Sequence, residues 1–353
     1  MTISTRRWIW ATMAAVVSAT GCGDASTSGR AEPSPDPGAA RTAASDPAAE
    51  VEIREWPVPW PATRPRDPYV GPDGRVWFVG QQGDYLGVLT PEDGEFARFD
   101  LDPGAGPHNL IVGPDGTVWY AGNRAAHIGR RDPASGAIEK IPLADPAAGD
   151  PHTMIFDGEG DIWFTVQGGN RVGHLDTDTR EIRIAQVPTP EARPYGIVAD
   201  GSGRAWFTEF GTNKIGRIDA ATMAIEEIVL PRAETRPRRL EIDGSGNVWY
   251  VDFAGGYLGR IDPAGEVREW RTPGGQAARP YGMAMDEKGR PWFVETGPSP
   301  NRLVGFDPQT ETFAWSAEIP SGGGSVRHMF FHVPDRTIWF GTDTGTIGRA
   351  TLP

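Results

Sequence analysis

Short apolar runs alternate with turns rich in Gly, Asp, Asn and Pro along most of the chain. In one clear stretch, the run GIVA is followed by the turn DGSG at 200–203, the run AWFTEF, a Gly/Asn turn and the run KIGRID at 214–219. A further turn leads to AIEEIVLP at 224–231. Short β-rich runs bounded by such residues predict antiparallel strands joined by tight turns. We therefore expect this stretch to form four strands.

The same order of runs and turns recurs seven times. A tryptophan followed by Phe or Tyr marks each copy, and successive tryptophans lie 42 to 47 residues apart. These residues are Trp77, Trp119, Trp163, Trp206, Trp249, Trp292 and Trp339. Four strands in such a period are typical of a β-propeller blade. The sequence therefore predicts an all-β fold, a seven-bladed propeller of four-stranded antiparallel blades over residues 51–353.

The two ends of the repeat region complement each other. The seventh copy stops at TIGRATLP, 346–353, which supplies a third strand but no fourth. The stretch VEIREWPVP at 51–59 resembles EVREWRTP at 266–273, where another copy has its fourth strand. We expect the N-terminal strand to complete the last blade, because a closed ring leaves no exposed sheet edge.

The segment before the repeats has a different composition. Residues 1–21 carry two arginines, a short apolar stretch and then small residues, which is the layout of a secretory signal peptide rather than a transmembrane helix. The stretch SATGC resembles a bacterial lipobox and implies cleavage before Cys22 and lipidation of its thiol, with a free thiol as the alternative. Residues 22–50 lack aromatic and large aliphatic side chains, so we expect a disordered tether.

Charge and cysteine content narrow the location and the partners. The formal net charge is −13, which argues against nucleic acid, and the single cysteine allows no internal disulfide. We expect an extracytoplasmic, membrane-anchored lipoprotein of the cell envelope or periplasm. It should be a monomer that touches the membrane only through its lipid anchor. Arg6 and Arg7 are compatible with either twin-arginine or general export.

We expect candidate functional residues at the start of each innermost strand. These strands surround the propeller axis, and ligand sites often lie at one end of that axis. The position eleven residues before each tryptophan should begin an inner strand. It holds donors and titratable groups, including three of the six histidines: Arg66, His108, His152, Tyr195, Arg238, Tyr281 and His328. Such a ring either fills a wet channel or binds an anionic or carbonyl-bearing ligand, with His as general acid or base. We interpret it as a site for a small-molecule or peptide-like ligand.

Carboxylates near the same end could hold a hard cation such as Mg²⁺ or Ca²⁺. Acids recur three residues past the tryptophan, as Glu209, Asp252 and Glu295. We interpret Glu209 and Glu295 as hydrogen-bond acceptors between blades, part of the packing of the repeat. Asp343, four residues past Trp339, remains a candidate metal ligand. Two further histidines, His127 and His174, fall on third strands away from this end, where we expect structural or surface roles.

The repeated pattern RPYGI, then DGxGxxWFTE, then NKIGRI resembles the streptogramin lyases, the virginiamycin B lyase family, over essentially all of residues 51–353. The resemblance implies the propeller fold and a carbon–oxygen lyase that opens a cyclic depsipeptide at its ester bond by elimination. It also implies a histidine as general base and Mg²⁺ held by two glutamates.

The family's last blade reads Glu-Pro-His and then Trp-Phe-x-x-Glu, and this chain has VRH at 326–328 and WFGTD at 339–343. On this match, His328 takes the place of the base and Asp343 that of one glutamate. Val326 falls on the other glutamate and Tyr281 on a substrate-binding histidine. Alternatively, the catalytic residues could lie in another pair of blades, at GDPH (149–152) and His108. In that arrangement Gln167 stands where the second carboxylate would be.

Two functions are favoured from the sequence, and a hydrolase of the lactonase type, which would need a clearer carboxylate cluster, is a third. The first is a metal-assisted lyase that opens an ester or lactone bond, with His328 as general base. The second is a non-catalytic ligand-binding or scaffolding propeller that uses the Arg/His/Tyr ring for an anionic ligand or a protein partner.

Overall fold

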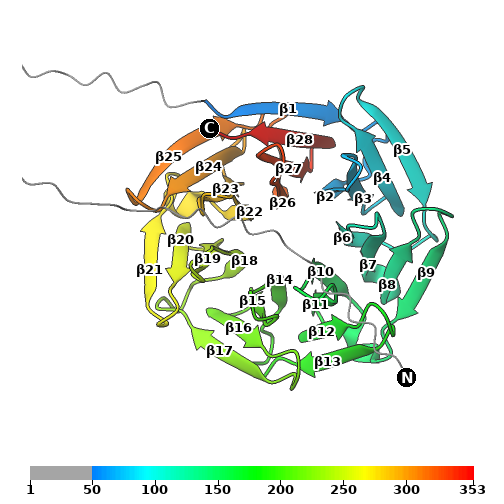
Figure 1. Ribbon diagram of the computed structural model, residues 1–353. Coiled ribbons are helices and arrows are strands. Elements are labelled where there is room, and N and C mark those ends of the chain that lie inside the picture. The colour runs from blue at the N-terminus through cyan, green and yellow to red at the C-terminus, as the bar shows by residue number, and fades with distance from the viewer. Residues whose placement is uncertain (1–49) are drawn as a thin grey trace, which may run out of the picture. The chain divides into compact units, whose positions relative to one another are not determined.

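A computed structural model describes residues 50–353 of the chain. It contains seven four-stranded antiparallel sheets arranged around a central axis (Figure 1). The predicted seven-bladed propeller is therefore confirmed. The signal peptide, the lipidation of Cys22 and the tether fall on residues outside the described part of the chain. Within that part, no helix is long and apolar enough to cross a membrane.

Each blade runs from the axis outwards, and the bounds of its strands follow the repeat. The innermost strands are β2 (Pro65–Val70), β6 (Pro107–Val112), β10 (Pro151–Phe156), β14 (Pro194–Ala199), β18 (Pro237–Ile242), β22 (Pro280–Met285) and β26 (Val326–His332). The second strands are β3 (Val76–Gly80), β7 (Val118–Gly122), β11 (Ile162–Val166), β15 (Ala205–Glu209), β19 (Val248–Asp252), β23 (Pro291–Glu295) and β27 (Thr337–Thr342).

The outer half of each blade is built in the same way. The third strands are β4 (Tyr85–Thr90), β8 (His127–Arg131), β12 (Arg171–Leu175), β16 (Lys214–Ile218), β20 (Tyr257–Ile261), β24 (Arg302–Asp307) and β28 (Thr346–Thr351). The fourth strands are β5 (Glu95–Asp100), β9 (Ile138–Pro142), β13 (Ile182–Gln186), β17 (Ile225–Val229), β21 (Val267–Arg271), β25 (Thr312–Glu318) and β1 (Glu52–Pro57). Three short 3₁₀ helices lie in loops: η1 (Asn123–Ala125), η2 (Pro146–Ala148) and η3 (Gly275–Ala277).

The N-terminal strand closes the ring. β1 pairs with β28 over six residues, and Figure 1 shows it as the outermost strand of the last blade. Trp56 of β1 is buried and stacks on Trp339, with ring centroids 5.5 Å apart. Glu55 accepts hydrogen bonds from the backbone nitrogen and hydroxyl of Ser321, at 2.6 and 2.7 Å. The predicted closure is confirmed.

Aromatic side chains of the second strands fill the core within each blade. Their packing requires glycine on the neighbouring strand. At Gly216 of β16, an added Cβ would lie 2.0 Å from the ring of Phe207. Glycine there allows close approach of a fully buried aromatic ring to the backbone. This explains the glycine in the repeated IGR motif.

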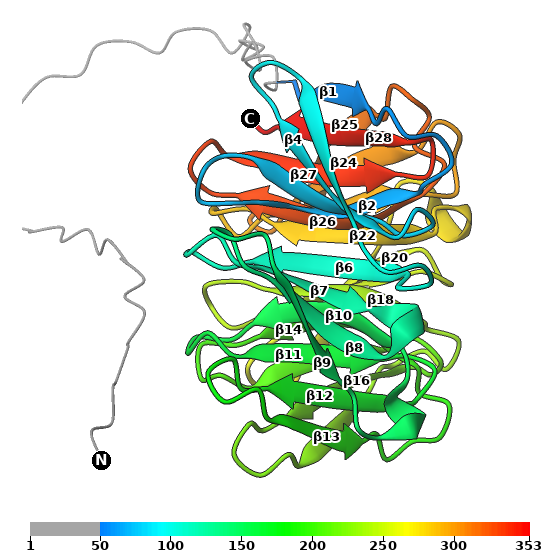
Figure 2. The ribbon, with the colours of Figure 1, turned by 90° about the vertical axis from the view of Figure 1, so that its right-hand side faces the viewer.

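The inner strands set the position of the candidate site. Figure 2 shows β6 and β22 running from one face of the propeller to the other. Six inner strands begin with proline, which suits a first strand residue because it has no N–H to donate. Each inner strand has a register shift within its first residues, as between Pro151 and Met154. These bulges turn the residues after the proline out of the regular pairing.

Candidate functional site

The position directly after the first residue of each inner strand forms a ring around the axis, which we call the inner ring. Its members are Arg66, His108, His152, Tyr195, Arg238, Tyr281 and Arg327. The next position forms a second row: Asp67, Asn109, Thr153, Gly196, Arg239, Gly282 and His328. Six of the seven predicted ring residues are therefore inner-ring residues, and the seventh, His328, is not.

In the last blade, the ring position lies one residue further from the tryptophan than in the preceding blade, because the hairpin between β26 and β27 has one more residue. Val326 pairs with Thr342, three residues past Trp339, just as Pro280 pairs with Glu295, three past its tryptophan. Val326 therefore takes the place of the proline and Arg327 that of the ring residue. The count back from Trp339 was wrong for this blade.

One arc of the inner ring is aromatic. The ring centroids of His108 and His152 are 3.6 Å apart, and those of His152 and Tyr195 are 4.3 Å apart. The hydroxyls of Tyr195 and Tyr281 are hydrogen-bonded to each other. Burial, together with nearby arginines, lowers the pKa of both histidines well below the usual range. Both imidazoles are therefore neutral at pH 7.

Arg238 lies in an aromatic cage. Its guanidinium carbon is 3.6 Å from the ring centroid of Tyr281, 4.3 Å from that of Phe253 and 4.5 Å from that of Phe210. The negative faces of aromatic rings stabilise a cation in this way. No carboxylate among the described residues forms an ion pair with Arg238, so its charge is available to a ligand.

Asp67 of the second row contacts two other arginines, Arg66 of the inner ring and Arg239 of the second row. Arg66 Nε donates to Asp67 Oδ1 at 3.0 Å, Asn109 Nδ2 donates to Oδ2 at 3.1 Å, and Arg239 Nη2 lies 3.9 Å from Oδ2. Burial alone would raise the pKa of Asp67, but the surrounding charges, above all Arg66, hold it well below its usual range. One carboxylate thus serves two guanidinium groups, and a positive surplus remains.

Several buried nitrogen atoms of this site have no hydrogen-bond partner within the described residues. They are Arg66 Nη2, Arg238 Nε, Arg239 Nη2 and His328 Nδ1. Arg66 and Arg239 are only 4% and 3% exposed. A buried donor without a partner is costly, and native structures rarely keep one without a reason. Carboxylate or phosphate oxygens are the acceptors that guanidinium groups bind best.

Two titratable groups could act as bases. Burial and the charges of Arg239 and Arg66 lower the pKa of His328 to about 3, so it accepts protons poorly at neutral pH. Burial would raise the pKa of Tyr195, but Arg238, Arg239 and Arg66 outweigh it and lower that pKa to about 8. Tyr195 is therefore better matched than His328 to proton transfer near pH 7.

Asp343 does not present the surroundings that Mg²⁺ requires. Arg327 binds both of its carboxylate oxygens, and Arg64 Nε lies 3.8 Å away. A cation there would compete with two guanidinium groups. In the register above, the Glu-Pro-His of the streptogramin lyases falls on Ser325, Val326 and Arg327. Their second glutamate and their histidine thus have no counterpart at those positions, and we derive no step through Mg²⁺.

Three other acids near this face bind loop backbone. Asp150 accepts hydrogen bonds from the backbone nitrogens of Gly168 and Gly169, at 2.6 and 3.0 Å. Glu295 accepts from the backbone nitrogen of Gly274 at 2.7 Å. Asp252 does the same for Arg236 at 2.9 Å. These bonds fix the loops that lead into the inner strands, as expected for turn residues and acceptors within the repeat.

Comparisons with known proteins agree with the repeat pattern. The model of the virginiamycin B lyase family matches residues 47–243. A solved structure of virginiamycin B lyase from Staphylococcus aureus is 28% identical, with a TM-score of 0.77, over 86% of this chain and 100% of that chain. A catalytically inactive variant of that enzyme with quinupristin gives the same values. A streptogramin B lyase is 27% identical, with a TM-score of 0.78, over 88% of this chain and 100% of that chain. A comparison with curated sequences gave no match.

Proposed function

The chain belongs to the virginiamycin B lyase family, and from that premise we propose that its propeller binds an anionic ligand at the inner ring. The observation that carries this proposal is the set of unpartnered nitrogen atoms on Arg66, Arg238 and Arg239. A carboxylate or phosphate group offers the acceptors that guanidinium groups bind best. The chain's own carboxylates form no hydrogen bond with these nitrogen atoms, although Arg239 Nη2 lies 3.9 Å from Asp67 Oδ2.

The charge distribution supports the same proposal. Four arginines, Arg66, Arg238, Arg239 and Arg327, face two carboxylates, those of Asp67 and Asp343. This local surplus is positive although the whole chain has a net charge of −13. Further arginines directly precede the first prolines of four inner strands: Arg64, Arg193, Arg236 and Arg279. Such a local field attracts anions towards the ring.

The ligand class follows from the ring's composition. The guanidinium groups suit a carboxylate or phosphate, and the neutral rings of His108, His152 and Tyr195 suit a flat or apolar portion beside it. A small organic acid or a peptide-like acid has both parts. Export, lipidation of Cys22 and a monomeric state stay predictions from the sequence, whereas the surroundings of Asp343 do not fit the Mg²⁺ that the resemblance implied.

Citrate and inorganic phosphate are suitable probes, titrated calorimetrically into the full-length chain at low salt. We expect one anion per chain, and affinity at least about tenfold weaker in Arg238→Gln, since a charge-assisted hydrogen bond contributes about 1.5–3 kcal/mol. Arg217→Gln is the matched control, because Arg217 pairs with Glu226 on the outer strands. Absence of anion binding, or equal affinity in parent and Arg238→Gln, would reject the proposal.

A lyase that opens an ester or lactone is the second candidate function. The low pKa of Tyr195, about 8, favours it, since a phenolate beside arginines can take a proton next to a carbonyl group. His328, the base expected from the sequence, has a pKa of about 3 and is the weaker candidate.

The antibiotic activity itself can be tested with quinupristin, which the inactive S. aureus variant was crystallised with. We expect no ring opening of quinupristin by this chain, with or without Mg²⁺, because Arg327 and Ser325 replace the family's histidine and glutamate. Chromatography separates intact from opened antibiotic. A ring-opened product of unchanged mass, formed by the parent and lost in His328→Ala or Tyr195→Phe, would make elimination the primary function.

A further inference from the structure

A second cluster of ligand-type side chains lies at the far face of the propeller from the inner ring. Asp157 directly follows β10, Asp161 directly precedes β11, and His174 lies on β12. Because the inner strands run from one face to the other (Figure 2), the turn after β10 lies at the face opposite the ring. One carboxylate oxygen of each aspartate and one ring nitrogen of His174 lie within 4.8 Å of one another.

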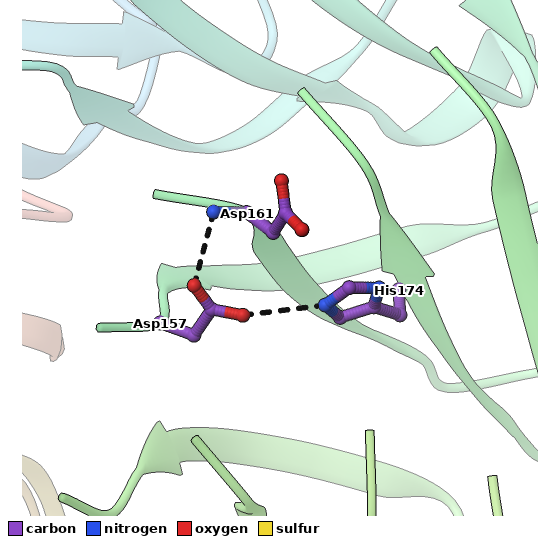
Figure 3. Close-up of side chains that lie close together, drawn as sticks. All are labelled: Asp157, Asp161 and His174. Carbon is purple, nitrogen blue, oxygen red and sulfur yellow. Dashed lines mark hydrogen bonds and ion pairs between the residues drawn. The ribbon is translucent and has the colours of Figure 1, made fainter. Parts of the chain in front are cut away.

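The three side chains face a common space (Figure 3). His174 Nε2 lies 3.3 Å from Asp157 Oδ2, and the backbone nitrogen of Asp161 donates to Asp157 Oδ1 at 3.0 Å. The side chains of Asp157 and His174 are each only 6% exposed. The donor set is thus one imidazole nitrogen and two carboxylates, held by a turn and a strand of one blade.

None of the other six blades has an acid at the position of Asp161. Asp161 stands two residues before its tryptophan, and the corresponding residues are Arg75, Thr117, Arg204, Asn247, Arg290 and Thr337. Where that residue is arginine it pairs with the turn aspartate, as Arg290 does with Asp286 at 2.6 Å. In this blade a carboxylate takes the place of a donor. Among the described residues, neither Asp157 nor Asp161 forms an ion pair with lysine or arginine.

The position of His174 is also unusual within the repeat. It lies opposite Trp163, where other third strands hold Val88, Arg130, Arg217, Arg260, Gly305 and Arg349. The Trp163 indole donates to the carbonyl of Gly203 at 3.2 Å, whereas Trp249 and Trp292 donate to their turn aspartates. Oδ2 of Asp157 therefore accepts no hydrogen bond from the tryptophan and contacts His174 instead. Two positions that hold arginine in several of the other blades therefore hold potential metal ligands here.

The hydrogen bonds within the cluster leave part of Asp161 open to a ligand. Oδ1 of Asp161 accepts a hydrogen bond from the backbone N–H of Thr177 at 2.9 Å. Its Oδ2 accepts no hydrogen bond within the described residues. Arg183 is the nearby cation, with Nη2 3.3 Å from His174 Nδ1.

We propose that Asp157, Asp161 and His174 bind one divalent transition-metal ion, with Zn²⁺ as the reference ion. Mixed imidazole and carboxylate donors suit Zn²⁺ and its first-row neighbours, whereas Ca²⁺ and Mg²⁺ prefer oxygen ligands only. Ligands at about 2.0–2.1 Å from zinc lie about 3.3 Å apart in a tetrahedral site. Nε2 of His174 and Oδ2 of Asp157 are already 3.3 Å apart, and the Asp161 oxygen, which lies within 4.8 Å of both, would complete the set by moving inwards. Water completes the coordination.

Metal binding changes the role of Arg183. A guanidinium group only donates, so Nδ1 of His174 is the acceptor in that contact and Nε2 carries the hydrogen that faces Asp157. The metal takes the place of this hydrogen, the proton moves to Nδ1, and the contact with Arg183 is released. Replacement of Arg183 by glutamine, whose amide oxygen can accept from Nδ1–H, is therefore expected to tighten metal binding.

The test is a calorimetric titration of Zn²⁺ into the full-length chain in a Cys22→Ser background, which removes the chain's single thiol. We expect one zinc per chain and a higher thermal midpoint. Affinity should fall at least about tenfold in Asp161→Asn and in His174→Arg, and rise in Arg183→Gln. Co²⁺ should give absorption bands of a coordinated site that vanish in the same variants. His174→Arg restores a residue common in the repeat, so it should fold.

His332→Ala is the matched control, since His332 forms another histidine–aspartate contact, 2.7 Å from Asp335. It should leave zinc affinity unchanged. Absence of zinc binding by the parent would overturn the proposal. So would binding that survives both Asp161→Asn and His174→Arg, or that is lost only in His332→Ala. None of these outcomes depends on anion binding at the inner ring.

Discussion

Asp67→Asn is expected to lower the free energy of unfolding by about 3–5 kcal/mol at pH 7, the range for removing one partner of a buried ion pair. Asp67 is 1% exposed and is the carboxylate that Arg66 and Arg239 share. Without it, two buried guanidinium groups lose their counter-charge. Citrate or phosphate should restore part of this loss and bind the variant more tightly than the parent, because the anion replaces the missing charge.

The effect of Asp67→Asn should depend on pH. The pKa of Asp67 is lower in the folded than in the unfolded chain. Its stabilisation is therefore complete above the unfolded pKa, about 3.9, and is lost as the pH falls towards the folded pKa. Urea unfolding followed by tryptophan fluorescence should show a large difference between parent and variant at pH 7 and a smaller one at pH 3.

Asp343→Asn is the control for Asp67→Asn, since the carboxylate of Asp343 is 26% exposed and partly exposed pairs contribute less. Equal stability of parent and Asp67→Asn at pH 7 would contradict the role given to Asp67. A difference that does not change between pH 3 and pH 7 would contradict its electrostatic origin.

Trp56→Ala is expected to lower the free energy of unfolding by about 3–5 kcal/mol, as for other buried tryptophans. Trp56 is 6% exposed, stacks on Trp339 and lies on the strand that closes the ring. The substitution leaves a cavity between β1 and the last blade. Thermal and urea unfolding both measure the loss. Glu52→Ala, at an exposed position of the same strand, should change stability little. If both variants unfold like the parent, the closing strand is not needed for stability.

The propeller could be predicted from the sequence because its determinants are local and repeated. Each blade carries its own turn residues, its own tryptophan and a glycine beside an aromatic ring, so seven copies reinforce one pattern. The closure by residues 51–59 was also visible, since a missing strand at one end matched an extra strand at the other. Pairing between β1 and β28 confirms it.

The inner ring was predicted where proline anchors the inner strand and was wrong in the last blade, where Val326 replaces the proline. A count from Trp339 cannot detect an extra residue in the hairpin between the two. Asp67 and Arg239 were missed for another reason. The bulges after the prolines break the regular alternation of side chains, so the second row can be recognised only from the observed register.

The cluster at Asp157 was not predicted, and His174 was expected to have a structural or surface role. Its residues come from a turn and a third strand, and only folding brings them together. The sequence does hold one signal, since Asp161 is the only acid among the seven residues that stand two before the tryptophans. Comparison of the copies position by position would have found it.

The position of a bound anion tests the binding proposal most directly. Crystals of the full-length chain soaked in selenate give an anomalous signal that locates the ion without assumptions about its contacts. We expect a selenate ion at the inner ring, within hydrogen-bond distance of the guanidinium groups of Arg66, Arg238 and Arg239. Selenate bound only at exposed arginines elsewhere, or no selenate at all, would contradict the proposal that this ring binds anions.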